Sequence, residues 1–269
     1  MFSHIPGASS MTDDAVPIAT TSAHAARGYS SAVLAWALIL SALIAGAAGW
    51  LVGEANHERF KPSLEASSQA YAFQALNREK KAADTKNAGL VFGVSGFLMA
   101  LAAGVGVGLA IGEPRRGLVV GLLGGLLNLA LAVGASYALV PIWYQNRDQA
   151  SADLMLPLLT HGGIWVPLGI GTGLVTGLVC RTRGRDSAPR LSLTILGGLI
   201  GAILGTVAFE LAAGLLFPLD GTVRPISETS ISRLFARLTL PLATAVGILW
   251  LVRPSLTTPR AAPIEPVSA

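Results

Sequence analysis

The sequence predicts an all-α, polytopic membrane protein with six transmembrane helices, on three observations. Hydrophobic residues make up 52% of the chain and charged residues only 13%, about half the charged share of a typical soluble domain. The charges are confined to short stretches between six apolar runs, each near or above the length of about 20 residues that crosses the hydrocarbon layer as a helix. The runs lack the alternation of apolar and polar residues typical of barrel strands.

The six expected spans cover about half of the chain. They are Ala32 to Val52, Gly89 to Ile111, Gly117 to Val140, Met155 to Val179, Leu191 to Phe217 and Leu234 to Val252. The first run is longer than the apolar core of a signal peptide, so we interpret it as a retained anchor. Pro157 and Pro167 are positioned to break the fourth span, and Pro241 to kink the sixth.

The regions at both ends of the chain differ in composition from this membrane domain, which we place at residues 31–253. Residues 1–30 are rich in Ser, Thr and Ala, and residues 254–269 contain four prolines. Both lack the apolar content needed to form a core, so we expect a disordered cytoplasmic leader and a disordered tail.

The connection at residues 53–87 is the longest within the membrane domain. Ser63 begins a stretch that predicts an amphipathic helix running to about Lys86, and we expect it to lie on the membrane surface or on the protein's outer face. Glu54, His57 and Glu58 have a spacing that places potential metal ligands on one helical turn. They do not form a closed ligand set, so we interpret them as a solvated helix end and predict no metal site.

Basic residues in the short loops predict the orientation. Arg115 and Arg116 lie between the second and third spans, and four further arginines lie between residues 181 and 190. The short loops on the opposite side hold three arginines. Because Arg and Lys in short loops favour the cytoplasm, we expect both termini to be cytoplasmic and the protein to be integral to a bacterial inner membrane. The connection at residues 53–87 is also basic, yet this orientation places it outside.

An internal repeat is the most informative pattern in the sequence. Residues 104–112 and residues 169–177 both have the pattern GxGxGLxxG, at an offset of 65, and the helices that follow them match at an offset of 73. Spans two and three therefore form a two-helix unit that spans four and five repeat. Each unit begins and ends on the same side, so we predict parallel copies related by an axis along the membrane normal.

Glycines spaced four residues apart form a stripe on each helix of the repeat. The four stripes are Gly104, Gly108 and Gly112; Gly117, Gly121 and Gly125; Gly169, Gly173 and Gly177; and Gly197, Gly201 and Gly205. Small residues on one helix face let backbones approach closely, and such packing holds helices together in lipid. We predict that spans two to five form the core by this glycine zipper, with spans one and six peripheral. Assembly with other copies and the lining of a narrow pore are the alternative uses.

A second set of candidate residues is polar and lies inside the apolar spans, where ionisable groups are costly and therefore suggestive. We expect a cluster towards the outer side formed by Glu210, Arg237, His161, Tyr137 and Ser95, in which Glu210 pairs with Arg237 or a neighbouring polar group. Tyr137 occupies the place of Glu210 in the repeat. Asn128 lies alone near the midplane and predicts an interhelical hydrogen bond.

Gly93-Val94-Ser95-Gly96 resembles the GxSG motif of rhomboid intramembrane proteases, and His161 lies two expected spans later, as the catalytic histidine does in that family. The resemblance implies a serine nucleophile at Ser95 with His161 as its base. In rhomboids these residues belong to the fourth and sixth core helices, whereas here they fall on the second and fourth spans. The upstream His and Asn pair of that family is also missing here.

No biochemical activity follows from these patterns. The sequence has no Walker motif, dinucleotide fingerprint, HExxH motif or pair of haem histidines, and Cys180 is its single cysteine, so we predict no cofactor and no catalytic residues. We expect a structural, assembly or regulatory protein, with a small-solute or ion channel or carrier as the alternative and an intramembrane serine hydrolase third. The expected partners are the lipid bilayer and another copy or membrane protein, and not nucleic acid.

Overall fold

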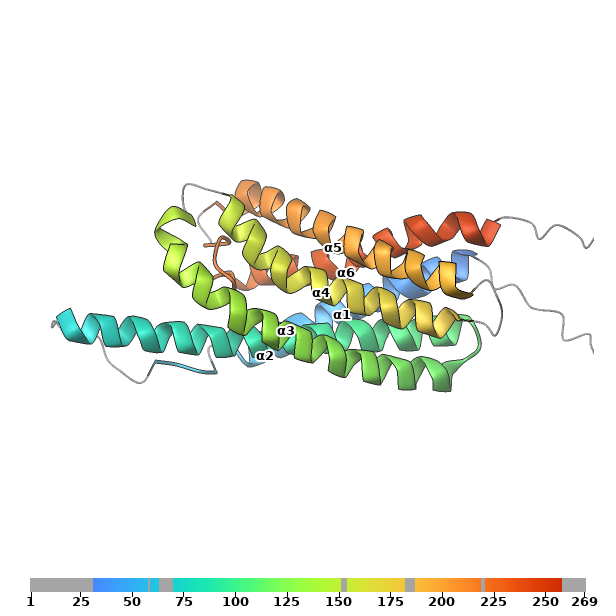
Figure 1. Cartoon of the computed structure of the whole chain (residues 1–269), viewed down its shortest axis with the longest axis horizontal. Helices are drawn as coiled ribbons and strands as arrows, with labels where there is room; N and C mark the ends of the chain where they lie inside the picture. Colours follow the sequence, from blue (N-terminus) through green and yellow to red (C-terminus); the bar gives the residue numbers. More distant parts are fainter. Residues whose placement is uncertain are drawn as a thin grey trace, which may run out of the picture.

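In the computed structural model, every expected span is a helix. The structure describes residues 31–57, 59–62, 70–150, 154–181, 187–218 and 221–257, and no strand occurs among them. Six helices are present: α1 Ser31–Ala55, α2 Ala70–Ala110, α3 Pro114–Ala150, α4 Met155–Cys180, α5 Ser187–Leu216 and α6 Ser230–Thr257 (Figure 1). All six are long and apolar enough to cross a membrane, so the prediction of six spanning-length helices is confirmed.

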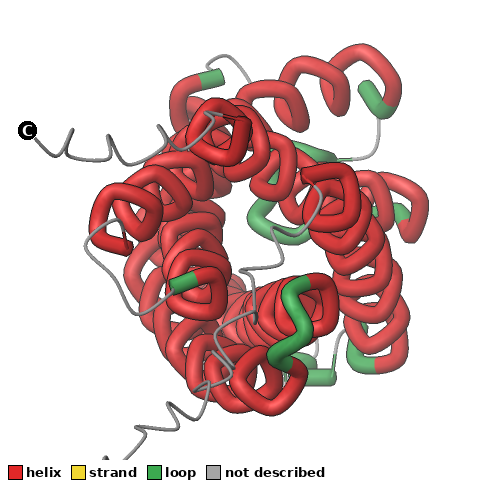
Figure 2. The backbone as a smooth tube through the Cα atoms, turned by 90° about the vertical axis from the view of Figure 1, so that its right-hand side faces the viewer, coloured by secondary structure: helices red, strands yellow, loops and turns green. Residues whose placement is uncertain are grey.

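The helices form a ring in which each contacts the next along the chain and α6 returns to α1, as the end-on view shows (Figure 2). Helix α4 also contacts α2 and α6. In the most apolar stretch of each helix, the share of buried residues is 67% for α4 and 22% for α3. The expectation that spans two to five form the core is therefore wrong for α3, since α1 and α6 are both more buried. Contacts with several neighbours, and not membership of the repeat, determine burial.

Helix α2 is longer than its apolar span. It runs unbroken for 41 residues, and its first turns project beyond the ends of the other helices (Figure 1). The amphipathic helix expected from Ser63 is thus continuous with the span and does not lie across it; residues 63–69 are outside the described part. Nothing between Lys86 and Gly89 breaks the helix. Asn87 joins the connection to it, because its side chain accepts from Phe60 N at 3.0 Å and donates to Phe60 O at 2.9 Å.

The turn between α2 and α3 follows the usual chemistry of helix ends. Gly112 has a φ of +78°, which favours glycine. Glu113 N donates to Gly108 O at 2.7 Å, and Pro114 opens α3. A Cβ at Gly112 would meet nothing within 4 Å. Its assignment to the packing stripe is therefore wrong: this glycine ends the helix.

The remaining glycines of the first two stripes bring α2 and α3 into backbone contact. A Cβ built at Gly104 would lie 2.6 Å from the Cα of Gly121, and one at Gly108 would lie 2.7 Å from the Cα of Gly117. Gly125, farther along α3, packs on Phe97, whose Cδ2 would be 2.8 Å from an added Cβ. Any side chain at these positions would force the two helices apart.

The second pair of stripes packs α4 on α5 and α5 on α6. A Cβ at Gly169 would lie 2.4 Å from Gly198 O, and one at Gly173 would lie 2.3 Å from Thr194 O. Gly177 likewise meets α5, with Thr194 Oγ1 2.3 Å from its built Cβ. The stripe at Gly197, Gly201 and Gly205 faces α6, with Gly247 and Ala243 as the nearest neighbours. Along these stripes α5 is therefore in close contact with both of its neighbours.

Candidate functional site

Two of the predicted polar residues meet inside the bundle. His161 on α4 and Glu210 on α5 are 2% and 3% exposed, and His161 Nδ1 contacts Glu210 Oε1. The other ring nitrogen, Nε2, is 3.3 Å from Pro225 O in the connection between α5 and α6. One imidazole therefore joins two helices and a loop.

The partners of His161 restrict the number of protons that this site can hold. The Pro225 carbonyl only accepts, so Nε2 must carry a proton to bond it. Either Nδ1 is also protonated and donates to a glutamate carboxylate, or a protonated Glu210 donates to Nδ1. Both arrangements hold two protons and have zero net charge. A pair without net charge costs less to bury than a lone carboxylate.

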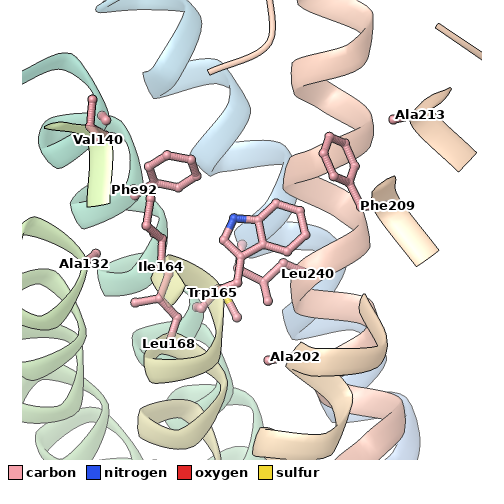
Figure 3. Close-up of a cluster of buried hydrophobic side chains, with 13 residues drawn as sticks. Phe92, Ala132, Val140, Ile164, Trp165, Leu168, Ala202, Phe209, Ala213 and Leu240 are labelled. Carbon is pink, nitrogen blue, oxygen red and sulfur yellow. The ribbon is translucent and has the colours of Figure 1, made fainter. Parts of the chain in front are cut away.

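Aromatic rings surround this pair. The His161 ring centroid is 5.6 Å from that of Trp165 and 5.4 Å from that of Phe209, and Trp165 and Phe209 are 5.2 Å apart. Figure 3 shows Trp165 and Phe209 beside Ile164, Leu168 and Leu240 in the buried cluster. These side chains exclude water from the pair and strengthen its electrostatic interaction.

The expected polar contact of Glu210 is confirmed with His161, and Arg237, the first of its expected partners, does not pair with it. Its guanidinium carbon is 4.4 Å from the ring centroid of Phe92 on α2, and the side chain is 8% exposed. Arg233, one turn earlier on α6, makes the ion pair that fastens α6 to the bundle: Nε and Nη2 donate to the Glu54 carboxylate at 2.6 and 2.8 Å. The sequence did not predict this pair, although Glu54 lies just after the first expected span and Arg233 just before the sixth.

Ser95 and Tyr137 are separate from the His161 and Glu210 pair. Ser95 Oγ donates to Val91 O of its own helix at 2.8 Å, while both ring nitrogens of His161 face other partners. The geometry thus gives the implied serine and histidine pair no support. Tyr137 is 53% exposed and lies over Gly89. Placing it in the cluster is wrong, because the surface of α3 that carries it faces outward.

Asn128, in the middle of α3, links the two halves of the bundle. It is fully buried on α3, and its Nδ2 donates to Gly96 O on α2 at 3.3 Å and to Leu168 O and Thr172 Oγ1 on α4 at 3.2 Å each. Its Oδ1 rests against Gly171, where a Cβ would lie 1.8 Å away. The predicted interhelical hydrogen bond is confirmed.

A polar cavity of about 360 Å³, here called the vestibule, opens at the end of the bundle where α2 projects. Its lining comes from α2, α3, the end of α1 and the loop before α6, and includes His57, Lys80, Asp84, Asn87, Val91, Trp143 and residues 224–228. Asp84 accepts from Tyr144 Oη, and Trp143 Nε1 donates to Val223 O at 2.9 Å. The first bond joins α2 to α3, and the second holds the loop before α6 against α3.

The residues considered as metal ligands have other roles or lie outside the described part. Glu54 is engaged by Arg233, and the structure does not describe Glu58. The described ranges contain no group of three His, Cys, Asp or Glu side chains that could hold a metal ion.

Comparison with known proteins gives no family to which this arrangement can be assigned. No protein-family model, curated protein or solved structure matches the chain significantly. The site must therefore be interpreted from its own geometry.

Proposed function

We propose that this chain is a structural or assembly component of a bacterial inner membrane, which acts by binding other copies or another membrane protein. One observation carries the proposal: the pockets found between the helices at mid-depth are small. The two that α1, α2, α4 and α6 line measure about 10 Å³ each, whereas sites for small molecules usually measure about 300–1,000 Å³.

The larger spaces lie outside this packed middle. The vestibule is confined to one end of the bundle, and a groove of about 520 Å³ lies between α1 and α6. Trp36 and Trp250 line this groove and are 65% and 66% exposed. Exposed tryptophans are typical of the membrane interface, which suits a body embedded among lipids and other helices.

The glycine stripes support the same proposal, and we interpret them as a glycine-zipper repeat of two parallel hairpins. The stripe positions meet backbone within the chain itself, as at Gly104 with Gly121 and Gly169 with Gly198. A stripe used in this way does not line a pore. It makes a rigid unit whose outward surfaces, such as α3, remain for partners.

The proposed orientation places both termini in the cytoplasm. Its test is a cysteine in place of the exposed Arg115, in a chain whose native Cys180 is replaced by serine. A reagent that cannot cross the membrane should label this cysteine only after the spheroplasts are broken. Labelling in intact spheroplasts would reverse the orientation.

A channel or carrier is the second candidate, and a specific observation favours it. The vestibule leads inward along α2 towards Phe92 and the buried Arg237. Transport would require the packed region around Asn128 and Leu168 to open.

The two candidates differ in solute flux. If the structural proposal holds, the flux of ions, sugars and amino acids into liposomes that contain the purified protein should be no faster than into protein-free liposomes. Particles in lipid nanodiscs should contain more than one copy of the chain or a stoichiometric partner. Saturable flux in liposomes would overturn the structural proposal.

A further inference from the structure

Arg237 is a buried cation to which the described part of the chain gives no anion. It is 8% exposed, and its contact is the face of Phe92. The two carboxylates that could have paired with Arg237 have other partners: Glu54 pairs with Arg233 and Glu210 with His161. A cation–π contact offsets only part of the cost of removing a guanidinium from water.

A buried donor without a partner in the described ranges lies on the neighbouring helix α4. Trp165 Nε1 is buried and has no hydrogen-bond partner among the described residues. Figure 3 shows the indole nitrogen on the side of the ring that faces Phe92, the ring that Arg237 covers. An orphaned buried N–H is uncommon and indicates an acceptor that the protein does not itself supply.

Arg237, Trp165 and Ser95 line one small void between α1, α2, α4 and α6. The rest of its lining is apolar, from Ala45, Met99, Ala236, Leu240 and Pro241. This void leaves about 10 Å³ for the centre of a water-sized sphere to move in, so it holds one small particle. The void therefore combines a cation and an N–H donor with space for a single small particle.

We propose that this void is a binding site for one small monoatomic anion, with chloride as the physiological ligand. Water would satisfy the donors but would leave the buried charge of Arg237 uncompensated, whereas an anion does both. The volume is too small for tetrahedral oxyanions such as sulfate or phosphate. The vestibule offers an approach, because Val91 in its lining is one helical turn from Ser95 and adjacent to Phe92. This site goes beyond the structural role and does not depend on it.

Thermal unfolding of the full chain in detergent tests the proposal. Chloride replaces gluconate at constant ionic strength, so that only specific binding changes the midpoint. The wild-type midpoint should rise with the logarithm of the chloride concentration above its Kd, by about 3 °C when chloride reaches ten times its Kd. Arg237→Gln should abolish the rise. Arg116→Gln should retain it, because Arg116 lies at the other end of the bundle and donates to Leu178 O.

A second variant keeps the test decisive if Arg237→Gln does not fold. Trp165→Phe preserves a packed ring without the N–H and should weaken chloride binding about tenfold; unchanged binding would contradict the site. A wild-type midpoint independent of chloride, or a chloride response that persists in Arg237→Gln, would overturn the proposal. An equal response to sulfate that is lost in Arg237→Gln would overturn the assignment to a small monoatomic anion.

Discussion

The hairpins α2–α3 and α4–α5 have the same glycine pattern but different places in the bundle. In each, the stripe of the first helix meets the backbone of the second, as at Gly108 with Gly117 and at Gly173 with Thr194. Yet α4 is the most buried helix and α3 the least. The glycine spacing thus determines how closely two helices pack, and other residues determine where the hairpin lies.

The register of the two hairpins differs by one helical turn. Gly104 lies opposite Gly121, whereas Gly169, its counterpart, lies opposite Gly198. Gly198 corresponds in the repeat to Gly125 and not to Gly121, since 198 − 73 = 125. A stripe without side chains fits the facing helix in more than one register. The connection between α4 and α5 is longer than that between α2 and α3 and permits the shift.

The residues off the stripes are what distinguish the hairpins. At the repeat offsets, His161 and Glu210 of the second hairpin correspond to Gly96 and Tyr137 of the first. The pair that includes Glu210 is buried, while Tyr137 is half exposed. The second hairpin therefore has a buried polar contact where the first has an exposed ring.

The largest effect is expected from filling a stripe. Gly173→Leu and Gly108→Leu should each cost more than about 3 kcal/mol, because the first side-chain atom already overlaps backbone of the facing helix. Thermal unfolding in detergent measures this loss. Gly134→Leu, in open space, is the control, and Gly53→Leu, where the nearest atom is 3.5 Å from the built Cβ, should have a modest effect. Equal midpoints for all four variants would refute the role of the stripes.

The next largest effect is expected at Glu210. Glu210→Leu removes the partner of a buried imidazole and should cost roughly 3 kcal/mol, whereas Glu210→Gln keeps a polar contact to Nδ1 and should cost less. Tyr137→Leu, at the corresponding place of the other hairpin, should be near neutral because that ring is half exposed. Unfolding free energies from denaturant titration rank the three. A Tyr137 variant as damaging as Glu210→Leu would remove the distinction between the hairpins.

The smallest of the three effects concerns the link between the hairpins. Asn128→Leu keeps the volume but loses the bonds to α2 and α4, and should cost about 1 to 2 kcal/mol. Asn146→Ala on the same helix loses only an exposed bond to Ile142 O and is the control. Hydrogen exchange at the facing segments of α2 and α4 should rise in the Asn128 variant alone. Unchanged exchange there would indicate that apolar packing joins the hairpins without Asn128.

The spans were predictable because the hydrocarbon layer requires long uninterrupted apolar helices; α4, for example, begins at Met155 as expected. Features that depend on the rotation of a helix about its own axis could not be predicted. The exposure of Tyr137 and the stacking of Arg237 on Phe92 follow from how α3 and α6 turn against their neighbours, and no local pattern encodes that rotation. The pairing of Arg233 with Glu54 joins residues 179 positions apart, so only the ring closure of α1 and α6 reveals it.

An experimentally determined density map of the protein in lipid nanodiscs is the most direct test of close packing at the glycine stripes and of the different register of the two hairpins, because it shows both hairpins in one structure. We expect the axes of α2 and α3, and those of α4 and α5, to be closer than the usual distance of about 8 Å, with Gly104 opposite Gly121 and Gly169 opposite Gly198. Ordinary separations of about 8–10 Å with side chains between the helices, or the same register in both hairpins, would contradict this expectation.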